Sequence, residues 1–285
     1  MALSIALPNK GSLSEEAAAI FREAGYRIRT DAKDLSFYDS SNEVEFFYLR
    51  PRDIATYVSS GEIDVGVTGR DLLLDTGTNA VERFGLDFGH SEFRMATLVD
   101  EANSAGLSQS FLSGKRIATS YPGLVRRYLS DKGIKAQIVE LDGAVEGAIK
   151  LGVADVVIDV VATGNTIKQA GLQLFGEPIL KSEAIVITRA NFQESSFELL
   201  MRRLSGVVIA RQYVLVDYDI ERNLLELACE ITPGLESPTV SPLQKADWVA
   251  VRAMVKRHEV HFVMDQLWDL GARGILVTDI HSCRL

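Results

Sequence analysis

The stretch LGVADVVIDVVATGNT, residues 151–166, contains the pattern that decides the fold of this chain. The apolar run Val156–Ile158 is typical of a buried strand, and it is followed by an acidic residue, Asp159. Small residues then form a loop, and a short helix is expected to begin near Asn165. A strand that leads through such a loop into a helix is the repeating unit of an α/β fold.

The same alternation of strand and helix extends outward from this stretch, over residues 1 to about 190. Helices are expected to open at Ser12, Pro51, Pro122 and Asp142. So many strands suggest two lobes, with the chain crossing near Met95–Val99 and again near Leu180–Thr188. The predicted strands are Ser4–Leu7, Val44–Leu49, Ile63–Val67, Met95–Val99, Arg116–Thr119, Ala136–Glu140, Val156–Asp159 and Ala184–Thr188.

The pattern changes after a polar helix predicted at Glu194–Leu204. The remaining elements follow the order βαββαβ, which is the ferredoxin-like arrangement and needs only about 70 residues. A separate C-terminal domain is therefore expected at 212–285. Its predicted elements are Gln212–Tyr218, helix Glu221–Cys229, Thr239–Leu243, Trp248–Val255, helix Glu259–Leu270 and Gly274–Thr278.

Composition narrows the class of protein. The residues are 47% hydrophobic and 24% charged, as in soluble globular proteins, and the net charge of −9 argues against a nucleic-acid partner. Cys229 and Cys283 form neither a disulfide framework nor a metal motif. The start of the chain lacks a basic leader and no apolar run is long enough for a membrane, so we expect a cytoplasmic protein.

Residues 159–166 have the chemistry of a sugar-phosphate site. Backbone N–H groups and hydroxyls of Thr163, Gly164, Asn165 and Thr166 at a helix start favour a phosphate. Asp159 can accept hydrogen bonds from ribose hydroxyls or help to hold magnesium. An ordinary strand-loop-helix corner remains the alternative, because Thr-Gly loops are common.

Asp155 is a second candidate for the ribose. Four extended residues place it about 13 Å from Asp159, too far for both to hold one ribose unless the strand starts late. A turn residue that leads into the strand is the equal alternative for Asp155.

The chain resembles one family over nearly its whole length: ATP phosphoribosyltransferase in its long form, the first enzyme of histidine biosynthesis. Asp159–Thr166 is similar to a phosphoribosyl-diphosphate loop, and four further stretches match family motifs in order and spacing. These stretches are Pro8–Leu13, Asp64–Asp71, Gly114–Pro122 and Leu141–Glu146. Ala162 departs from the pattern, because a small hydroxyl residue is frequent there.

The resemblance implies a two-lobed, periplasmic-binding-protein-like catalytic region. The strand pattern predicts lobe I at 1–95 and 184–211 and lobe II at 96–183. The resemblance implies that N1 of ATP attacks C1 of phosphoribosyl diphosphate and expels pyrophosphate, with Mg²⁺ held at Asp159. It also implies homo-oligomers, both dimers and hexamers.

Cations near the leaving group and carboxylates near the sugar suit that reaction. The candidate cations lie where open α/β folds bind ligands, at or just after the ends of strands, and the list is Lys10, Arg50, Arg70 and Arg94. Glu146 is a candidate for the ribose or the metal, and Ser120 and Tyr121 are candidates for adenine. For each cation a surface salt bridge is the alternative.

The segment Pro233–Thr239 resembles the signature of a regulatory domain that binds histidine as feedback inhibitor. Leu235, Ser237 and Thr239 are candidates from this loop, with the two hydroxyls facing the histidine carboxylate. Asp219 or Asp217 is a candidate for the amine or imidazole. A plain turn between helix and strand is the alternative.

Two other functional classes stay open from the sequence. A non-catalytic solute-binding protein also has two α/β lobes around a cleft, although the absent leader and the Asp159–Thr166 loop argue against it. A phosphoribosyltransferase with a different acceptor would keep the sugar-phosphate site.

Overall fold

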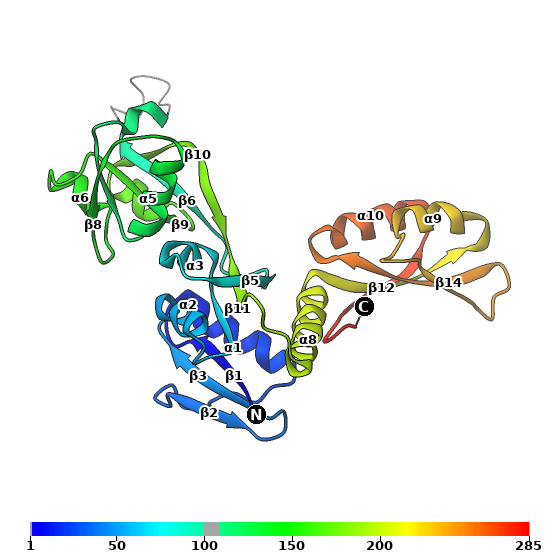
Figure 1. Ribbon diagram of the computed structural model, residues 1–285. Coiled ribbons are helices and arrows are strands. Elements are labelled where there is room, and N and C mark those ends of the chain that lie inside the picture. Colours follow the sequence, from blue (N-terminus) through cyan, green and yellow to red (C-terminus); the bar gives the residue numbers. More distant parts are fainter. Residues whose placement is uncertain (1, 100–108, 285) are drawn as a thin grey trace. The chain divides into compact units, whose positions relative to one another are not determined.

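A computed structural model describes residues 2–99 and 109–284 of the chain (Figure 1). These residues form two compact units. One contains the chain up to Ala19 and Tyr26–Phe197, and the other contains Ile20–Gly25 and everything from Glu198 onward. Within the described ranges, no helix combines the length and apolar character that a membrane span requires.

The first unit contains a six-stranded sheet in the order β2-β3-β1-β4-β11-β5. β1 pairs in parallel with β3 and β4, so the carboxyl ends of these three strands meet at one edge. Helix α2 (Pro51–Ser60) buries Ile54, Ala55 and Val58 in the core of this sheet. The strands are β1 (Leu3–Pro8), β2 (Ser36–Asp39), β3 (Val44–Leu49), β4 (Val65–Gly69), β5 (Ala80–Gly85) and β11 (Ala184–Arg189), and helices α1 (Ser12–Glu23) and α3 (Arg70–Thr76) follow β1 and β4.

The same unit contains a five-stranded sheet in the order β10-β6-β9-β7-β8. β7 pairs in parallel with β8 and β9, whereas β6 runs antiparallel to β9 and to β10. The strands are β6 (Ser91–Leu98), β7 (Arg116–Thr119), β8 (Gln137–Glu140), β9 (Val156–Val161) and β10 (Leu172–Ser182). The helices are η1 (Gln109–Leu112), α5 (Pro122–Asp131), α6 (Gly147–Lys150) and α7 (Asn165–Gln169).

The chain passes between the two sheets twice. The first linker lies between β5 and β6, at 86–90, and the second is the single residue Glu183 between β10 and β11. The first linker precedes the predicted crossing at Met95–Val99, because those residues lie within or directly after β6 of the five-stranded sheet. We therefore propose two lobes and a C-terminal domain, and we place the first boundary between the lobes at 86–90.

The second unit contains a four-stranded antiparallel sheet in the order β13-β14-β12-β15. The element sequence β12-α9-β13-β14-α10-β15 and this strand order are those of a ferredoxin-like domain. The predicted fold class is confirmed. The elements are α8 (Ser195–Gln212), β12 (Tyr213–Glu221), η2 (Arg222–Leu224), α9 (Leu225–Ile231), β13 (Thr239–Pro242), β14 (Trp248–Lys256), η3 (Arg257–Glu259), α10 (Val260–Leu270) and β15 (Arg273–Asp279).

Three strands were not predicted, and each lacks the continuous apolar pattern of a buried strand. β2 is four residues long and mostly exposed, and β5 is exposed around Glu82 and Arg83. β10 contains Gly176 and Pro178, and its pairing with β6 shifts register there. The helix predicted from Asp142 begins only at Gly147, because Gly143 and Ala144 have positive φ angles and form a turn.

Candidate functional site

Asp159 lies in β9, two residues before the strand ends, and the residue is only 8% exposed. Its Oδ2 accepts the Ser120 N–H at 3.2 Å and the Ser120 hydroxyl at 2.8 Å, and its Oδ1 accepts the Val160 N–H at 2.7 Å. Burial raises the pKa of Asp159, the hydrogen bonds oppose that increase, and the charge of Glu146 adds to it. The structure therefore brings three predicted residues together: Asp159, Ser120 and Glu146.

The predicted phosphate loop follows β9 directly. Ala162, Thr163, Asn165 and Thr166 are exposed, so their backbone and side-chain donors face solvent. Gly164 has φ +73° at the residue before α7, a left-handed conformation that glycine adopts without strain. The loop therefore presents solvent-exposed residues within a few positions of Asp159.

A cavity of about 300 Å³ lies in the first unit beside these residues. Its lining includes the predicted site residues Lys10, Tyr121 and Ala162. The complete lining is Lys10, Gly11, Ser12, Leu13, Pro51, Gly69, Asp71, Leu72, Gly89, His90, Ser91, Tyr121, Val160 and Ala162. Residues that follow β1, β4, β7 and β9 therefore meet at one cavity.

Asp71, the last residue of the motif Asp64–Asp71, also lines the cavity but was not predicted as a site residue. It is 6% exposed. Its backbone N–H donates to the Ser182 hydroxyl at 3.0 Å, and that hydroxyl donates to Asp71 Oδ1 at 2.7 Å. Tyr121 hydrogen-bonds to the Asp71 side chain, and its pKa is raised, first by burial and then by the charge of Asp71. A Cβ on Gly69 would lie 2.3 Å from Asp71 Oδ1, so glycine leaves space for this carboxylate.

The four predicted cations differ in their surroundings. Lys10 is exposed at the cavity, and Arg50 is exposed as the residue that precedes α2. Arg70 instead binds Glu82 and Glu183 at 2.7 and 2.9 Å, and these carboxylates raise its pKa. Arg94 binds Glu92 at 2.8 Å and the Gly176 carbonyl at 3.0 Å. Lys10 and Arg50 are therefore better placed than the other two to meet a ligand's charge.

Asp155 lies at the opposite end of β9 from the loop. Its carboxylate accepts the Arg116 backbone N–H at 2.8 Å and the Arg116 guanidinium at 2.8 Å. The hydrogen bonds from Arg116 lower the pKa of Asp155 to about 2. This geometry favours the structural alternative, in which Asp155 anchors the start of the strand.

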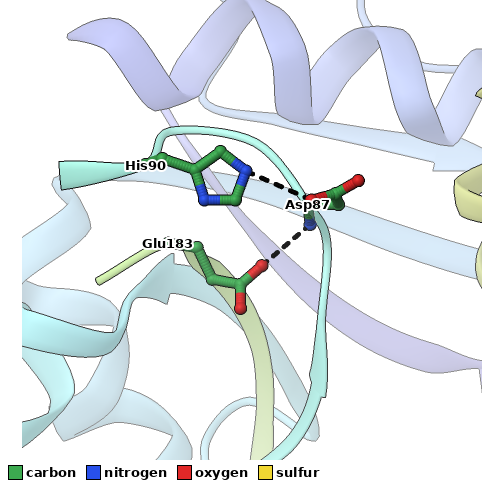
Figure 2. A group of neighbouring side chains, drawn as sticks. All are labelled: Asp87, His90 and Glu183. Carbon is green, nitrogen blue, oxygen red and sulfur yellow. Dashed lines mark hydrogen bonds and ion pairs between the residues drawn. The ribbon is translucent and has the colours of Figure 1, made fainter. Parts of the chain in front are cut away.

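Asp87, His90 and Glu183 form a group on the linkers between the two sheets, with potential metal-ligand atoms within 4.8 Å of one another (Figure 2). The His90 ring lies 3.2 Å from Asp87 Oδ1, and Glu183 accepts the Asp87 N–H at 3.0 Å. Glu183 also binds Arg70. A carboxylate already held by two donors, beside a histidine nitrogen, does not match the all-oxygen ligands that magnesium prefers.

Asp159 and Glu146 fit magnesium better. Both offer carboxylate oxygens, and their mutual repulsion contributes to the raised pKa of Asp159. A divalent cation would remove that repulsion. Both Asp159 oxygens already accept protein hydrogen bonds, so these residues suit an ion held mainly by a bound pyrophosphate and by water.

The predicted histidine-site residues lie in the second unit. Leu235, Ser237 and Thr239 are exposed in and after the loop that follows α9, and Asp219 is half-buried in β12. Asp217 is not free, because it binds Arg252 at 2.7 Å. Asp219 is therefore the better-placed of the two predicted acidic partners.

Comparisons with known proteins identify the family of this chain. The family model described as ATP phosphoribosyltransferase matches residues 50–206, and the model for the C-terminal domain of the same family matches residues 210–282. The ATP phosphoribosyltransferase of Pseudarthrobacter chlorophenolicus is 57% identical over 99% of this chain and 100% of its own length. That of Salinispora tropica is 55% identical, with the same coverage of both chains.

A solved structure, the ATP phosphoribosyl transferase (HisG:HisZ) complex from Thermotoga maritima, superposes with a TM-score of 0.60. It is 26% identical, and the match covers 71% of this chain and 96% of that chain. The full-length identity to named enzymes decides between the functional classes that the sequence left open. The chain belongs to the ATP phosphoribosyltransferase family and is a pentosyltransferase.

Proposed function

We propose that the enzyme transfers the phosphoribosyl group of phosphoribosyl diphosphate to N1 of the adenine of ATP. In this reaction the bond from N1 to C1 of the ribose forms and the bond from C1 to the pyrophosphate oxygen breaks. Pyrophosphate leaves with the electron pair of that bond. The observation that carries the proposal is the buried Asp159 carboxylate, held by Ser120 beside an exposed donor loop and a cavity lined by Tyr121.

In this proposal Asp159 acts as the carboxylate beside the ribose. As pyrophosphate leaves, positive charge develops at C1, and a fixed negative group nearby stabilises it. The hydrogen bonds from Ser120 and Val160 fix the orientation of the carboxylate before substrate arrives. The loop Ala162–Thr166 would receive the 5′-phosphate through its exposed N–H groups and hydroxyls.

The cavity suits the adenine ring. The aromatic ring of Tyr121 lines the cavity and packs against the Phe93 ring in a T-shaped contact, with ring centroids 5.6 Å apart. Asp71 lies in the same lining and can accept a hydrogen bond from an exocyclic amine. Lys10 and Arg50 would meet the phosphates, and Arg70 and Arg94 would act on the site through the chain segments that they hold.

Magnesium, bound with phosphoribosyl diphosphate, would neutralise charge on the leaving pyrophosphate. Asp159 and Glu146 are the residues of this chain that would hold it. We also propose that the enzyme works in the cytoplasm and forms dimers and hexamers, as the family resemblance implies.

Purified enzyme tests the reaction directly. With ATP, phosphoribosyl diphosphate and Mg²⁺ together we expect pyrophosphate release and a product whose new bond is at N1 of adenine, located by NMR. Omission of any one component should stop release. A folded sample that releases no pyrophosphate, or that modifies another acceptor in preference to ATP, would contradict the proposal.

We further propose that histidine inhibits the enzyme from the second unit. Ser237 and Thr239 offer exposed hydroxyls for a carboxylate, and the half-buried Asp219 offers an acceptor for an amine. Asp219→Asn should weaken inhibition by histidine in the full chain while the uninhibited kcat stays unchanged. Asp265→Asn, the same substitution at an exposed residue of α10, is the control. Unchanged inhibition in Asp219→Asn would remove Asp219 from the histidine site.

A further inference from the structure

Arg52, in the first turn of α2, contacts three groups that belong to other elements. One guanidinium nitrogen donates to the carboxylate of Asp75, at the end of α3. The other donates to the carbonyl oxygen of Ser120 at 2.7 Å. Its central carbon lies 5.0 Å from the centre of the Tyr121 ring. Arg52 belongs to α2, which packs on the six-stranded sheet, and it therefore holds the segment that follows β7 of the five-stranded sheet.

The ion pair between Arg52 and Asp75 is supported by burial and hydrogen bonding of Asp75. The Asp75 side chain is 5% exposed, and its second oxygen accepts the Leu124 N–H of α5 at 3.0 Å. Gly123 lies so close to this helix end that a Cβ on it would be 2.0 Å from the Asp75 carbonyl oxygen. An exposed ion pair contributes little because water competes with it, but here one partner is buried and each of its oxygens has a donor.

The segment held by Arg52 carries the donors that fix the proposed ribose carboxylate. The peptide and hydroxyl of Ser120 bond Asp159, and the Ser120 carbonyl is the group that Arg52 holds. Tyr121, the next residue, lies under the guanidinium and hydrogen-bonds to Asp71. Movement of this segment would therefore displace the donors of Asp159 and the aromatic wall of the cavity together.

We propose that Arg52 is a positioning residue: by bridging Asp75 and the Ser120 carbonyl across the two sheets, it sets Ser120 against Asp159 and Tyr121 in the cavity. Arg52 does not touch substrate in this role. The proposal rests on the function proposed for Asp159, and it makes the approach of the two sheets a condition for an ordered site.

Arg52→Gln tests the bridge, because glutamine lacks the charge and the planar fork of arginine. We expect kcat for pyrophosphate release to fall on the order of 10- to 100-fold, the effect of losing a charge-assisted hydrogen bond. Arg52→Lys keeps the charge without the fork, so its kcat should lie between those of Arg52→Gln and the wild type. Thermal melting of each variant reports how much protein is folded.

Two further changes give the proposal a signature that a stability defect does not share. If Arg52 acts through Ser120, Arg52→Gln should lower kcat much less in a Ser120→Ala background than in the wild type, because both changes weaken the same support of Asp159. Gly123→Ala pushes α5 from α3 without changing any charge, and it should likewise lower kcat with little change in KM. The double variant Arg52→Gln/Gly123→Ala should lose little more kcat than either single variant, because both changes disturb the same contact at Asp75.

Arg126→Gln is the matched control. Arg126 lies on α5 and pairs with Glu140, but both side chains are more than half exposed, at 58% and 54%. Its kinetics should match the wild type. Folded Arg52→Gln with wild-type kcat would overturn the proposal, and so would a loss of kcat that is undiminished in the Ser120→Ala background. So would a raised KM for one substrate at unchanged kcat, which would make Arg52 a substrate ligand. An inactive wild type would instead refute the proposed function.

Discussion

Ser120→Ala is the change that isolates one interaction of the site most cleanly. It removes the hydroxyl that donates to Asp159 Oδ2 at 2.8 Å, and it leaves the backbone donor and the Arg52 contact at the carbonyl in place. Asp159 is only 8% exposed, so water can replace the lost donor only in part. Asp159 should become less well oriented and less readily ionised.

A hydrogen bond to a charged group contributes about 1.5–3 kcal/mol, so the loss should lower kcat/KM for phosphoribosyl diphosphate about 10- to 100-fold. The pKa of Asp159 is already raised by burial, and the Ser120 hydroxyl opposes that increase. Without the hydroxyl the pKa rises further, and the acid limb of the pH profile should move to higher pH. Pyrophosphate release measured across pH gives both quantities.

Ser130→Ala is the control, because Ser130 is exposed on α5. Its pH profile should overlay that of the wild type. A Ser120→Ala enzyme with normal kcat/KM and an unmoved acid limb would show that the Ser120 hydroxyl does not support the catalytic carboxylate. A loss that appears only in KM for ATP would instead assign Ser120 to the nucleotide.

Three other changes test separate parts of the molecule. Asp155→Asn should lower the melting temperature at pH 7. The ion pair with Arg116 lowers the Asp155 pKa from 3.8 to about 2, so the stabilisation by this pair is complete above pH 3.8 and is lost as the pH falls through 2. The difference in melting temperature between variant and wild type should therefore vanish over that range. Gly69→Ala places a Cβ 2.3 Å from Asp71 Oδ1, so calorimetry should show weaker ATP binding with little change in phosphoribosyl-diphosphate binding; equal losses for both would point to a general folding defect. Tyr218→Phe removes the buried hydrogen bond to Thr232, at 2.7 Å, and denaturant unfolding should show a loss of about 1–2 kcal/mol; an unchanged midpoint would mean that the pair is not stabilising.

Most strands were predictable from a continuous or alternating apolar pattern in the sequence, whereas β2, β5 and β10 were not. Val44–Leu49 was predicted with its observed limits, because its strand is buried at alternate positions in the sheet. β5 and β10 form through pairing with β11 and β6, which are distant in sequence, and that pairing outweighs their charged or glycine and proline residues. Local pattern carries no information about such partners.

The site shows the same division. The loop after Asp159 is a local feature, so its glycine and small residues revealed it. The ion-pair partners of Arg70 lie elsewhere in the chain, and Glu183 is 113 residues away, so nothing near Arg70 in sequence indicated its two ion pairs. Arg52 is likewise 68 residues from the Ser120 carbonyl that it holds. Side chains that act across the two sheets become visible only when the fold is known.

The proposed role of Asp159 is tested most directly by comparing Asp159→Asn with Asp155→Asn, two identical changes in and just before the same strand. Pyrophosphate release should fall steeply in Asp159→Asn, while the protein stays folded and still binds histidine. Asp155→Asn should keep near-normal turnover and lose thermal stability. Normal turnover in Asp159→Asn, or an equal loss in a folded Asp155→Asn, would contradict the assignment of the ribose site to the carboxyl end of β9.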